Sequence, residues 1–177
     1  MSQADREVRI PEEDALRADL YGFLGALLSA PPSTELLNKT ARLSGDTTEL
    51  GAAIGALSRV AKATNTKAVA REYNALFIGL GRGELLPYSS YYMTGFLNEK
   101  PLAALRNDMA ASGIERSENV FEPEDNIASL CEMMAGLILG RFGDPADLQS
   151  QKEFFNKHIA PWAGHFLAGP VSGRALL

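Results

Sequence analysis

The sequence has little of the chemistry that disulfides and metal centres need, with one cysteine and two histidines in 177 residues. A single cysteine cannot form an internal disulfide, which fits a reducing compartment. No close pair of metal-binding side chains exists, so we expect no cofactor and no metal. Runs of basic residues are also missing. The 17 lysines and arginines are outnumbered by 22 acidic residues, which argues against a nucleic-acid partner.

Long apolar runs are absent too. The longest, from Ile127 to Leu139, is interrupted by Glu132 and is too short to cross a bilayer, so we expect no membrane span. The N-terminal residues are charged and lack the apolar core of a secretory signal. A soluble, cytoplasmic protein is therefore expected, with residues 1–10 as a disordered lead-in.

The chain does contain the apolar spacing that is typical of helices. Between residues 122 and 142, apolar residues recur at i, i+3, i+4 and i+7 and nearly encircle the segment. A helix that is apolar on most sides is buried, so we predict a central helix at about 122–142. Pro123 suits its first position, and the neighbouring carboxylates complement the positive end of the helix dipole.

The same spacing appears in most of the chain, and no strand-like alternation competes with it. The first helix should begin near Pro11 and carry its leucines, Leu16, Leu20 and Leu24 among them, on one face. We therefore predict an all-α fold, a single compact domain of seven or more helices around the central helix. The domain is expected to span residues 11–170, followed by a loose tail at 171–177.

Three candidate sites have simpler structural explanations. The glycine run at residues 79–83 could hold a phosphate, but it lacks the lysine and the preceding strand of a P-loop, so a flexible connector is favoured. Cys131 could be a nucleophile, but its place on the apolar stripe favours a small buried side chain. His158 and His165 could bind a metal, yet Pro161 interrupts their spacing, and a structural role is favoured.

The carboxylates Glu122, Glu124 and Asp125 leave two interpretations open. They could compensate the dipole at the start of the central helix. They could also dock a cationic ligand, because carboxylates bind arginine through paired hydrogen bonds. The stretch from Pro87 to Tyr92 is similarly open, since its tyrosines suit both a half-buried wall and a recognition surface.

Three stretches, in this order along the chain, resemble the TorD/DmsD/NarJ family of redox-enzyme maturation chaperones. The first, from Glu72 to Tyr92, is similar to the family's Leu-Phe pair, glycine-bearing loop and Pro-x-x-Ser-x-Tyr sequence. The second, from Glu122 to Asn126, resembles the Glu-Pro-x-Asp-His signature, with asparagine in place of histidine. The third, from Phe154 to Trp162, is similar to His-x-x-Pro-Trp. The residues that carry the first match are Leu76, Phe77, Gly79, Pro87, Ser90 and Tyr92.

The resemblance implies a TorD-like all-α fold without catalytic activity and with some tendency to form domain-swapped homodimers. It also implies a function. Relatives bind, in the cytoplasm, the signal peptide or N-terminal region of a molybdenum-cofactor oxidoreductase subunit and assist its maturation before export or assembly. Because asparagine cannot titrate, no role that needs a charged imidazole is expected of Asn126.

These implications lead to a hypothesis for a peptide-binding site. Apolar client residues are expected in a groove near Leu76, Phe77 and the tyrosines that follow them. A basic group, such as a twin-arginine pair, is expected at Asp125 and Glu122. Asp125 should lie in the first turn of the central helix with its carboxylate at a surface groove, and Glu124 should add negative charge. The full predicted set is Leu76, Phe77, Pro87, Tyr88, Ser90, Tyr92, Glu122, Asp125 and Asn126.

Two alternatives from other classes stay open. One is a small hydrolase-like enzyme that uses Asp125 together with His158 as acid and base. The other is a structural helical subunit of a larger complex. An assay of candidate substrates with metal analysis would detect the enzyme, and reversible peptide binding would separate a chaperone from a permanent subunit.

Overall fold

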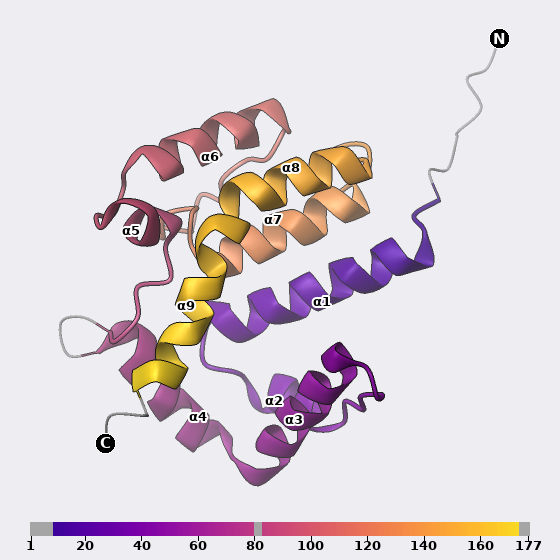
Figure 1. The fold of residues 1–177 in the computed structure, drawn as a ribbon, viewed down its shortest axis with the longest axis vertical. Helices are drawn as coiled ribbons and strands as arrows, with labels where there is room; N and C mark the ends of the chain where they lie inside the picture. Colours follow the sequence, from indigo (N-terminus) through magenta and orange to yellow (C-terminus); the bar gives the residue numbers. More distant parts are fainter. Residues whose placement is uncertain (1–8, 80–82, 174–177) are drawn as a thin grey trace. The chain divides into compact units, whose positions relative to one another are not determined.

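The computed structural model describes residues 9–79 and 83–173, with side chains up to Gly169. Within these residues the chain forms nine α-helices, one short π-helix and no strand, so the prediction of an all-α fold is confirmed. The helices are α1 (Glu12–Ser29), α2 (Thr34–Ala41), α3 (Glu49–Ala63), α4 (Thr66–Tyr73), the π-helix η1 (Asn74–Ile78), α5 (Ser89–Thr94), α6 (Lys100–Ala111), α7 (Ile127–Leu139), α8 (Leu148–His158) and α9 (Ala160–Gly173) (Figure 1). None of the helices in this described part has the length and apolar character that a membrane span requires.

The chain divides into two compact units. Unit 1 comprises residues 1–25 and 87–177, and unit 2 comprises residues 26–86. The single domain at residues 11–170 stays a prediction. Residues 1–8 of the predicted lead-in lie outside the described residues, as do residues 174–177 of the predicted tail. Residues 171–173 of that tail instead continue helix α9.

Unit 2 consists of short helices whose first turns are capped by the residues before them. Ser33 accepts a hydrogen bond from the Leu36 amide at the start of α2, and Asn65 does the same for Ala68 in α4. Thr48 caps α3 through the amide of Gly51. These caps satisfy amides that have no partner within their own helix, and Ser, Thr and Asn are residue types that favour this position.

The π-helix η1 contains Leu76 and Phe77, two of the predicted site residues. Its last turn closes through the Gly79 amide, which donates to the Asn74 carbonyl at 2.7 Å. The chain then returns against it, because the Leu85 amide donates to the Leu76 carbonyl at 2.8 Å. A Cβ at Gly83 would lie 2.4 Å from the backbone carbon of Phe77, so this close return requires glycine. The glycine connector therefore has a fixed structural task at Gly83, while residues 80–82 lie outside the described residues.

Helix α7 is the buried centre of unit 1, as predicted. Nine of its 13 residues are buried. The prediction of its start is wrong, however: the helix begins at Ile127, and Asn126 caps it by accepting a hydrogen bond from the Ala128 amide at 2.9 Å. Pro123 is therefore outside the helix, in a turn where the Asn126 amide donates to its carbonyl at 3.2 Å. The helix ends at Leu139, where Gly140 adopts the left-handed conformation with φ of 67°.

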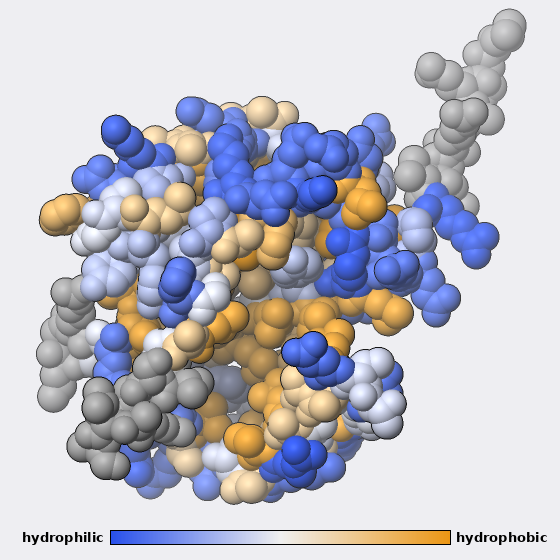
Figure 2. Space-filling view, viewed as in Figure 1, coloured by the Kyte–Doolittle hydropathy of each residue, from blue (hydrophilic) through white to orange (hydrophobic). Residues whose placement is uncertain are grey.

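Other helices of unit 1 surround α7, with α8 and α1 on its flanks in Figure 1. They contribute the large buried side chains Leu102, Leu105, Met109, Phe154, Trp162 and Phe166. Hydrophilic side chains cover the outer part of the unit where α6 and α8 lie, at the top of the space-filling view (Figure 2). The unit therefore has the usual layered arrangement of an apolar centre under polar helix faces.

Helix α1 approaches α7 at a small residue. Leu16 is 62% exposed, whereas Ala18 and Gly25 are buried. A Cβ at Gly25 would lie 3.1 Å from Cγ of Glu132, so the two helices come close at this glycine. Small residues permit such an approach, and this outweighs the larger apolar area of the leucine face in fixing which side of α1 meets α7.

Candidate functional site

Two of the sequence motifs are joined by backbone hydrogen bonds in unit 1. The Ile127 amide donates to the Pro87 carbonyl at 2.9 Å, and the Ser89 amide donates to the Asp125 carbonyl at 3.0 Å. Tyr88 and Asn126 thereby form an isolated antiparallel bridge. The Pro87–Ser90 segment and the end of the Glu122–Asn126 signature are therefore one structural element, although they lie far apart in the sequence.

Asp125 is the buried centre of this junction, with a side chain that is 1% exposed. Its Oδ2 accepts hydrogen bonds from the Ser90 amide at 2.8 Å and from the Ser89 hydroxyl at 3.2 Å. The prediction that this carboxylate lies at a surface groove in the first turn of α7 is wrong. It instead caps α5, whose own preceding residue, Tyr88, makes no capping hydrogen bond through its side chain.

Two buried polar atoms at the junction have no hydrogen-bond partner among the described residues. They are Oδ1 of Asp125 and the hydroxyl oxygen of Ser90, a side chain with no exposed surface. Leaving such atoms unpaired is costly, so the junction depends on the bonds that Oδ2 does make.

Glu122 and Tyr88 form a polar pair at the outer side of the junction. The Tyr88 hydroxyl donates a hydrogen bond to Oε2 of Glu122, and Glu122 is exposed. Partial burial raises the pKa of Tyr88, and the carboxylate of Glu122 raises it further. Tyr88 therefore remains a neutral hydrogen-bond donor throughout the physiological pH range, and the pair presents one carboxylate and one aromatic ring next to each other.

Glu124 is not available to a client, in contrast to the expectation that it adds negative charge to the site. It is 8% exposed. Arg106 of α6 donates to its Oε2 from Nη2 at 2.8 Å and from Nε at 3.1 Å, and Arg116 lies 3.5 Å from its Oε1. Burial raises the pKa of Glu124, but the hydrogen bonds and charges of the arginines outweigh burial and lower the pKa overall. No local sequence pattern indicates either arginine as its partner.

The third motif meets the first at Tyr92. The ring of Tyr92 lies 5.4 Å from that of Trp162, centre to centre, and meets Phe166 edge-on at 6.0 Å. Trp162 donates from its indole nitrogen to the His158 carbonyl at 2.7 Å. Tyr92 and Ser90 therefore connect α5 to the interior, and sequence analysis missed Trp162 and Phe166 as their supports.

Leu76 and Phe77, the remaining predicted residues, belong to unit 2. Both side chains are half-buried, and the Phe77 ring lies 4.7 Å from that of Tyr73. The other seven predicted residues (Pro87, Tyr88, Ser90, Tyr92, Glu122, Asp125 and Asn126) belong to unit 1.

His158 pairs with Asp108 and not with Asp125. The distance from Nε2 of His158 to Oδ2 of Asp108 is 2.7 Å, and Lys157 binds the same oxygen at 2.6 Å. Burial lowers the pKa of His158, which outweighs the opposite effect of Asp108. Burial also acts to raise the pKa of Asp108, but hydrogen bonds and charges from Lys157 and His158 lower it overall. The acid–base pair of the hydrolase alternative is therefore not formed, because the hydrogen bonds of Asp125 go to Ser89 and Ser90.

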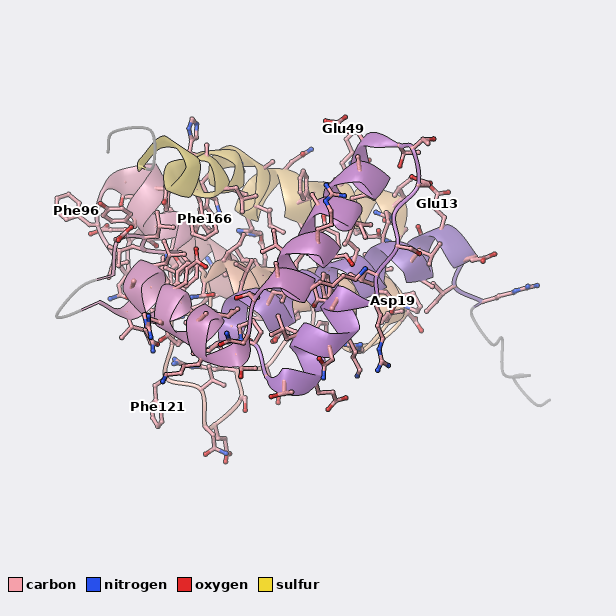
Figure 3. The ribbon with its side chains drawn as sticks, turned by 90° about the horizontal axis from the view of Figure 1, so that it is seen from below. Glu13, Asp19, Glu49, Phe96, Phe121 and Phe166 are labelled. Carbon is pink, nitrogen blue, oxygen red and sulfur yellow. The ribbon has the colours of Figure 1, made fainter. Side chains whose placement is uncertain are left out.

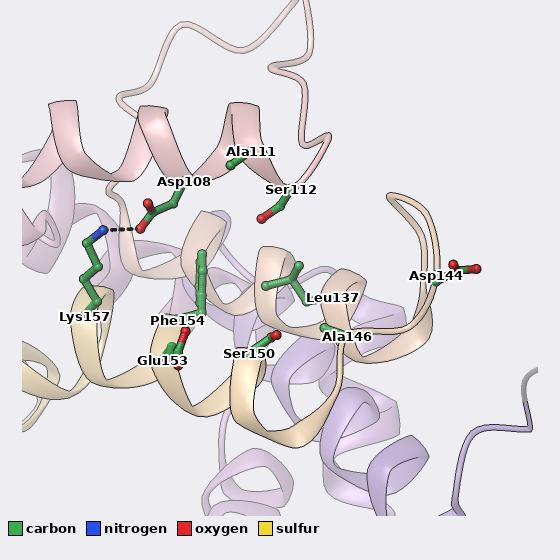
Figure 4. Close-up of a pocket in the computed structure, with 10 residues that line it drawn as sticks. All are labelled: Asp108, Ala111, Ser112, Leu137, Asp144, Ala146, Ser150, Glu153, Phe154 and Lys157. Carbon is green, nitrogen blue, oxygen red and sulfur yellow. Dashed lines mark hydrogen bonds and ion pairs between the residues drawn. The ribbon is translucent and has the colours of Figure 1, made fainter.

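A pocket of about 420 Å³ lies next to this ion pair, between α6, α7 and α8 (Figure 4). Asp108, Glu153 and Lys157 line it together with Phe154. In Figure 4 the ammonium group of Lys157 points to the Asp108 carboxylate and not into open space.

Cys131 is buried and unpaired. Burial raises the pKa of its thiol to about 11, with a smaller contribution from Glu132. A thiol with this pKa is almost entirely protonated at neutral pH and is a poor nucleophile, which supports the packing interpretation. Within residues 9–79 and 83–169, no group of three or more histidine, cysteine or acidic side chains is arranged to hold a metal ion.

Comparisons with known proteins agree with the motifs. The family model described as the nitrate reductase delta subunit matches residues 44–168. The chaperone protein TorD of Vibrio cholerae is 31% identical over 105 residues, which cover 55% of this chain and 48% of the relative. The chaperone protein TorD of Aliivibrio fischeri is 26% identical over 171 residues, which cover 85% of this chain and 80% of the relative.

The fold is also similar to a solved structure. The crystal structure of a proposed redox enzyme maturation protein from Archaeoglobus fulgidus matches with a TM-score of 0.51 and 22% identity. The match covers 81% of this chain and 80% of that one. This likeness supports a TorD-like all-helical fold.

The chain therefore belongs to the nitrate reductase delta subunit family, and the family resemblance seen in the three motifs is confirmed. It spans about half the length of the Vibrio cholerae relatives that it matches.

Proposed function

We propose that the protein is a cytoplasmic chaperone for a molybdenum-cofactor oxidoreductase subunit. It binds the signal peptide or N-terminal region of that subunit and assists its maturation before export or assembly. Family membership supports this proposal, as do relatives that are named chaperone proteins. The proposal includes no catalytic activity, which is consistent with a thiol held in its protonated form and with the absence of an Asp125–His158 pair.

The observation that carries the proposal is the junction between Pro87–Ser90 and Glu122–Asn126. It has a buried, hydrogen-bonded interior at Asp125 and an outer side formed by Tyr88 and Glu122. A preformed platform of this kind costs little conformational entropy when a flexible client segment binds to it. The client segment loses conformational entropy when it becomes ordered on binding. The platform offers it an aromatic ring and a carboxylate.

Two exposed aromatic residues of unit 1 are consistent with surface that a partner covers. Phe121, which directly precedes Glu122, is 89% exposed, and Phe96 is 70% exposed. Figure 3 shows both rings pointing outward from the ribbon. A phenylalanine loses favourable burial energy when it stays in water, so a client that covers it gains roughly 1.5–3 kcal/mol per fully buried ring.

The predicted site residues take two roles in this proposal. Tyr88, Glu122 and the half-buried Asn126 contact the client. Asp125 and the buried Pro87 and Ser90 hold the platform together, and Tyr92 anchors it to α9. Leu76 and Phe77 belong to unit 2, and their part in peptide binding stays a prediction.

The homodimer remains part of the proposal. Exchange of one unit between two chains requires a connector that can extend. The glycine run at residues 79–83 lies shortly before Leu86, where unit 2 ends in the sequence. A dimer formed in this way would interconvert slowly with the monomer.

Capture of the client tests the chaperone function. The tagged protein is co-expressed in turn with each molybdoenzyme catalytic subunit encoded in the same genome, and any complex is purified. We expect one client subunit per chaperone chain, and loss of capture when the N-terminal region of the client is removed. Capture that is unaffected by this truncation, or no capture of the intact subunit, contradicts the proposal.

A further inference from the structure

Unit 1 contains a groove of about 530 Å³ beside the Glu122–Glu124 segment, which we name the Gly22 groove. Its walls come from α1 at Gly22, from the segment between α6 and α7, and from α7 itself. On α7 the adjacent residues Glu132 and Met133 both line it. A carboxylate and an apolar side chain therefore stand together on one wall.

Carboxylates outnumber cations on these walls, because four glutamates and two arginines line the groove. Glu124 is already matched by its arginines. Glu115 and Glu132 are exposed and take part in no ion pair within the described residues. The groove therefore offers two carboxylates to a basic group.

The lining also has a buried apolar part. Met109, Ile114 and Met133 line the groove and are each at most 7% exposed. A long basic side chain can lay its methylene stem on such a surface while its charged end reaches a carboxylate in water. Arginine fits this combination best, since its planar guanidinium can bind a carboxylate through two parallel hydrogen bonds.

Glycine at position 22 keeps the groove open. A Cβ at this position would have no atom within 4 Å, whereas one turn later a Cβ at Gly25 would lie 3.1 Å from Glu132. Gly25 thus serves close packing of α1 on α7, but Gly22 has no packing role. A larger residue at position 22 would occupy the groove without disturbing the helix contact.

We propose that the Gly22 groove binds a basic residue and its apolar neighbours in the client segment. The inference rests on the proposed chaperone function and adds the place where the basic part of the client segment binds, a groove whose walls include Glu115 and Glu132. Charge complementarity selects this occupant, because nucleic acids and anionic membranes would meet a surplus of carboxylates. The volume suits a few side chains of an extended peptide.

The test measures the affinity of the full chain for a labelled peptide from the N-terminal region of the molybdoenzyme subunit that the capture experiment identifies. Gly22→Leu fills the groove and should weaken binding by about tenfold or more. Gly164→Leu is the matched control, because a Cβ at Gly164 on α9 also has no atom within 4 Å and Gly164 does not line the groove. The control should bind as the wild type does.

A second variant removes charge and keeps shape. Glu115→Gln combined with Glu132→Gln should weaken binding roughly two- to thirty-fold, as expected for two exposed ion pairs. Its affinity should also depend less on salt concentration, since screening acts on the removed attraction. Glu12→Gln combined with Glu49→Gln changes the net charge equally at exposed positions that do not line the groove and should have no effect.

The outcomes separate this inference from the chaperone function. Unchanged affinity in both groove variants overturns the groove and leaves the function standing. Failure of the wild type to bind the peptide and to capture the subunit refutes the function and the groove together. Circular dichroism checks that each variant folds, and if Gly22→Leu does not, the paired glutamine variant decides.

Discussion

Replacing Asp125 by alanine should destabilise the protein rather than delete a contact with the client. The side chain is 1% exposed, and Oδ2 binds the Ser90 amide at 2.8 Å and the Ser89 hydroxyl at 3.2 Å. The Ser90 amide lies in the first turn of α5, whose preceding residue supplies no side-chain cap. Alanine leaves this buried amide without an acceptor.

The size of the effect follows from these two bonds. A buried donor that loses its acceptor costs about 1–3 kcal/mol, and an ordinary hydrogen bond contributes about 1 kcal/mol. The free energy of unfolding of Asp125→Ala should therefore fall by about 2–4 kcal/mol. Asp125→Asn retains one acceptor oxygen and should lose about 1–2 kcal/mol. These losses are a substantial part of the stability of a typical domain.

Urea denaturation of both variants measures this loss, and a double-mutant cycle with Ser89→Ala isolates the shared hydrogen bond. Under conditions where Asp125→Asn is folded, its affinity for the client peptide should stay within about threefold of the wild type. Wild-type stability of Asp125→Ala together with a loss of affinity of about tenfold or more would refute the reasoning, because Asp125 would then be a contact residue.

Three further predictions concern packing, pH and assembly. Cys131→Ala should cost about 1 kcal/mol in unfolding free energy and leave client capture intact; a folded variant that loses capture would reveal a reactive thiol. Burial acts to raise the pKa of Glu124. The hydrogen bonds and charge of Arg106, together with the charge of Arg116, outweigh burial and hold this pKa below its ordinary value of 4.5. The stabilisation is therefore present above that pH and is lost on acidification, so denaturant titrations of Glu124→Gln should show a weaker fall in stability towards about pH 3 than the wild type. Size-exclusion chromatography should resolve monomer and dimer that exchange slowly, and a single species at every concentration and after long storage would contradict this.

Features that depend on neighbouring residues were predictable from the sequence. The caps at Ser33, Thr48 and Asn65 each act on an amide three residues ahead, so the pattern contains both partners. The buried character of α7 follows from its own apolar residues. The all-α fold was therefore accessible without coordinates.

The site was less accessible because its bonds join distant parts of the chain. The acidic start of the predicted helix suggested dipole compensation, but Asp125 caps a different helix through Ser90, which lies 35 positions away. Glu124 lies beside arginines that no local pattern pairs with it. Likewise, the leucines of α1 gave the stronger apolar signal, whereas Gly25 fixed the contact through its small size.

Calorimetric titration with the N-terminal peptide of the molybdoenzyme subunit tests the central claim most directly. The account predicts saturable binding of one peptide per chain, weakened by Gly22→Leu and by exchange of the peptide's basic residues for glutamine. An internal peptide of the same subunit, matched in length and net charge, is the control and should not bind. Equal binding of both peptides, or no binding of the N-terminal one, would contradict the claim that this protein recognises the N-terminal region of its client.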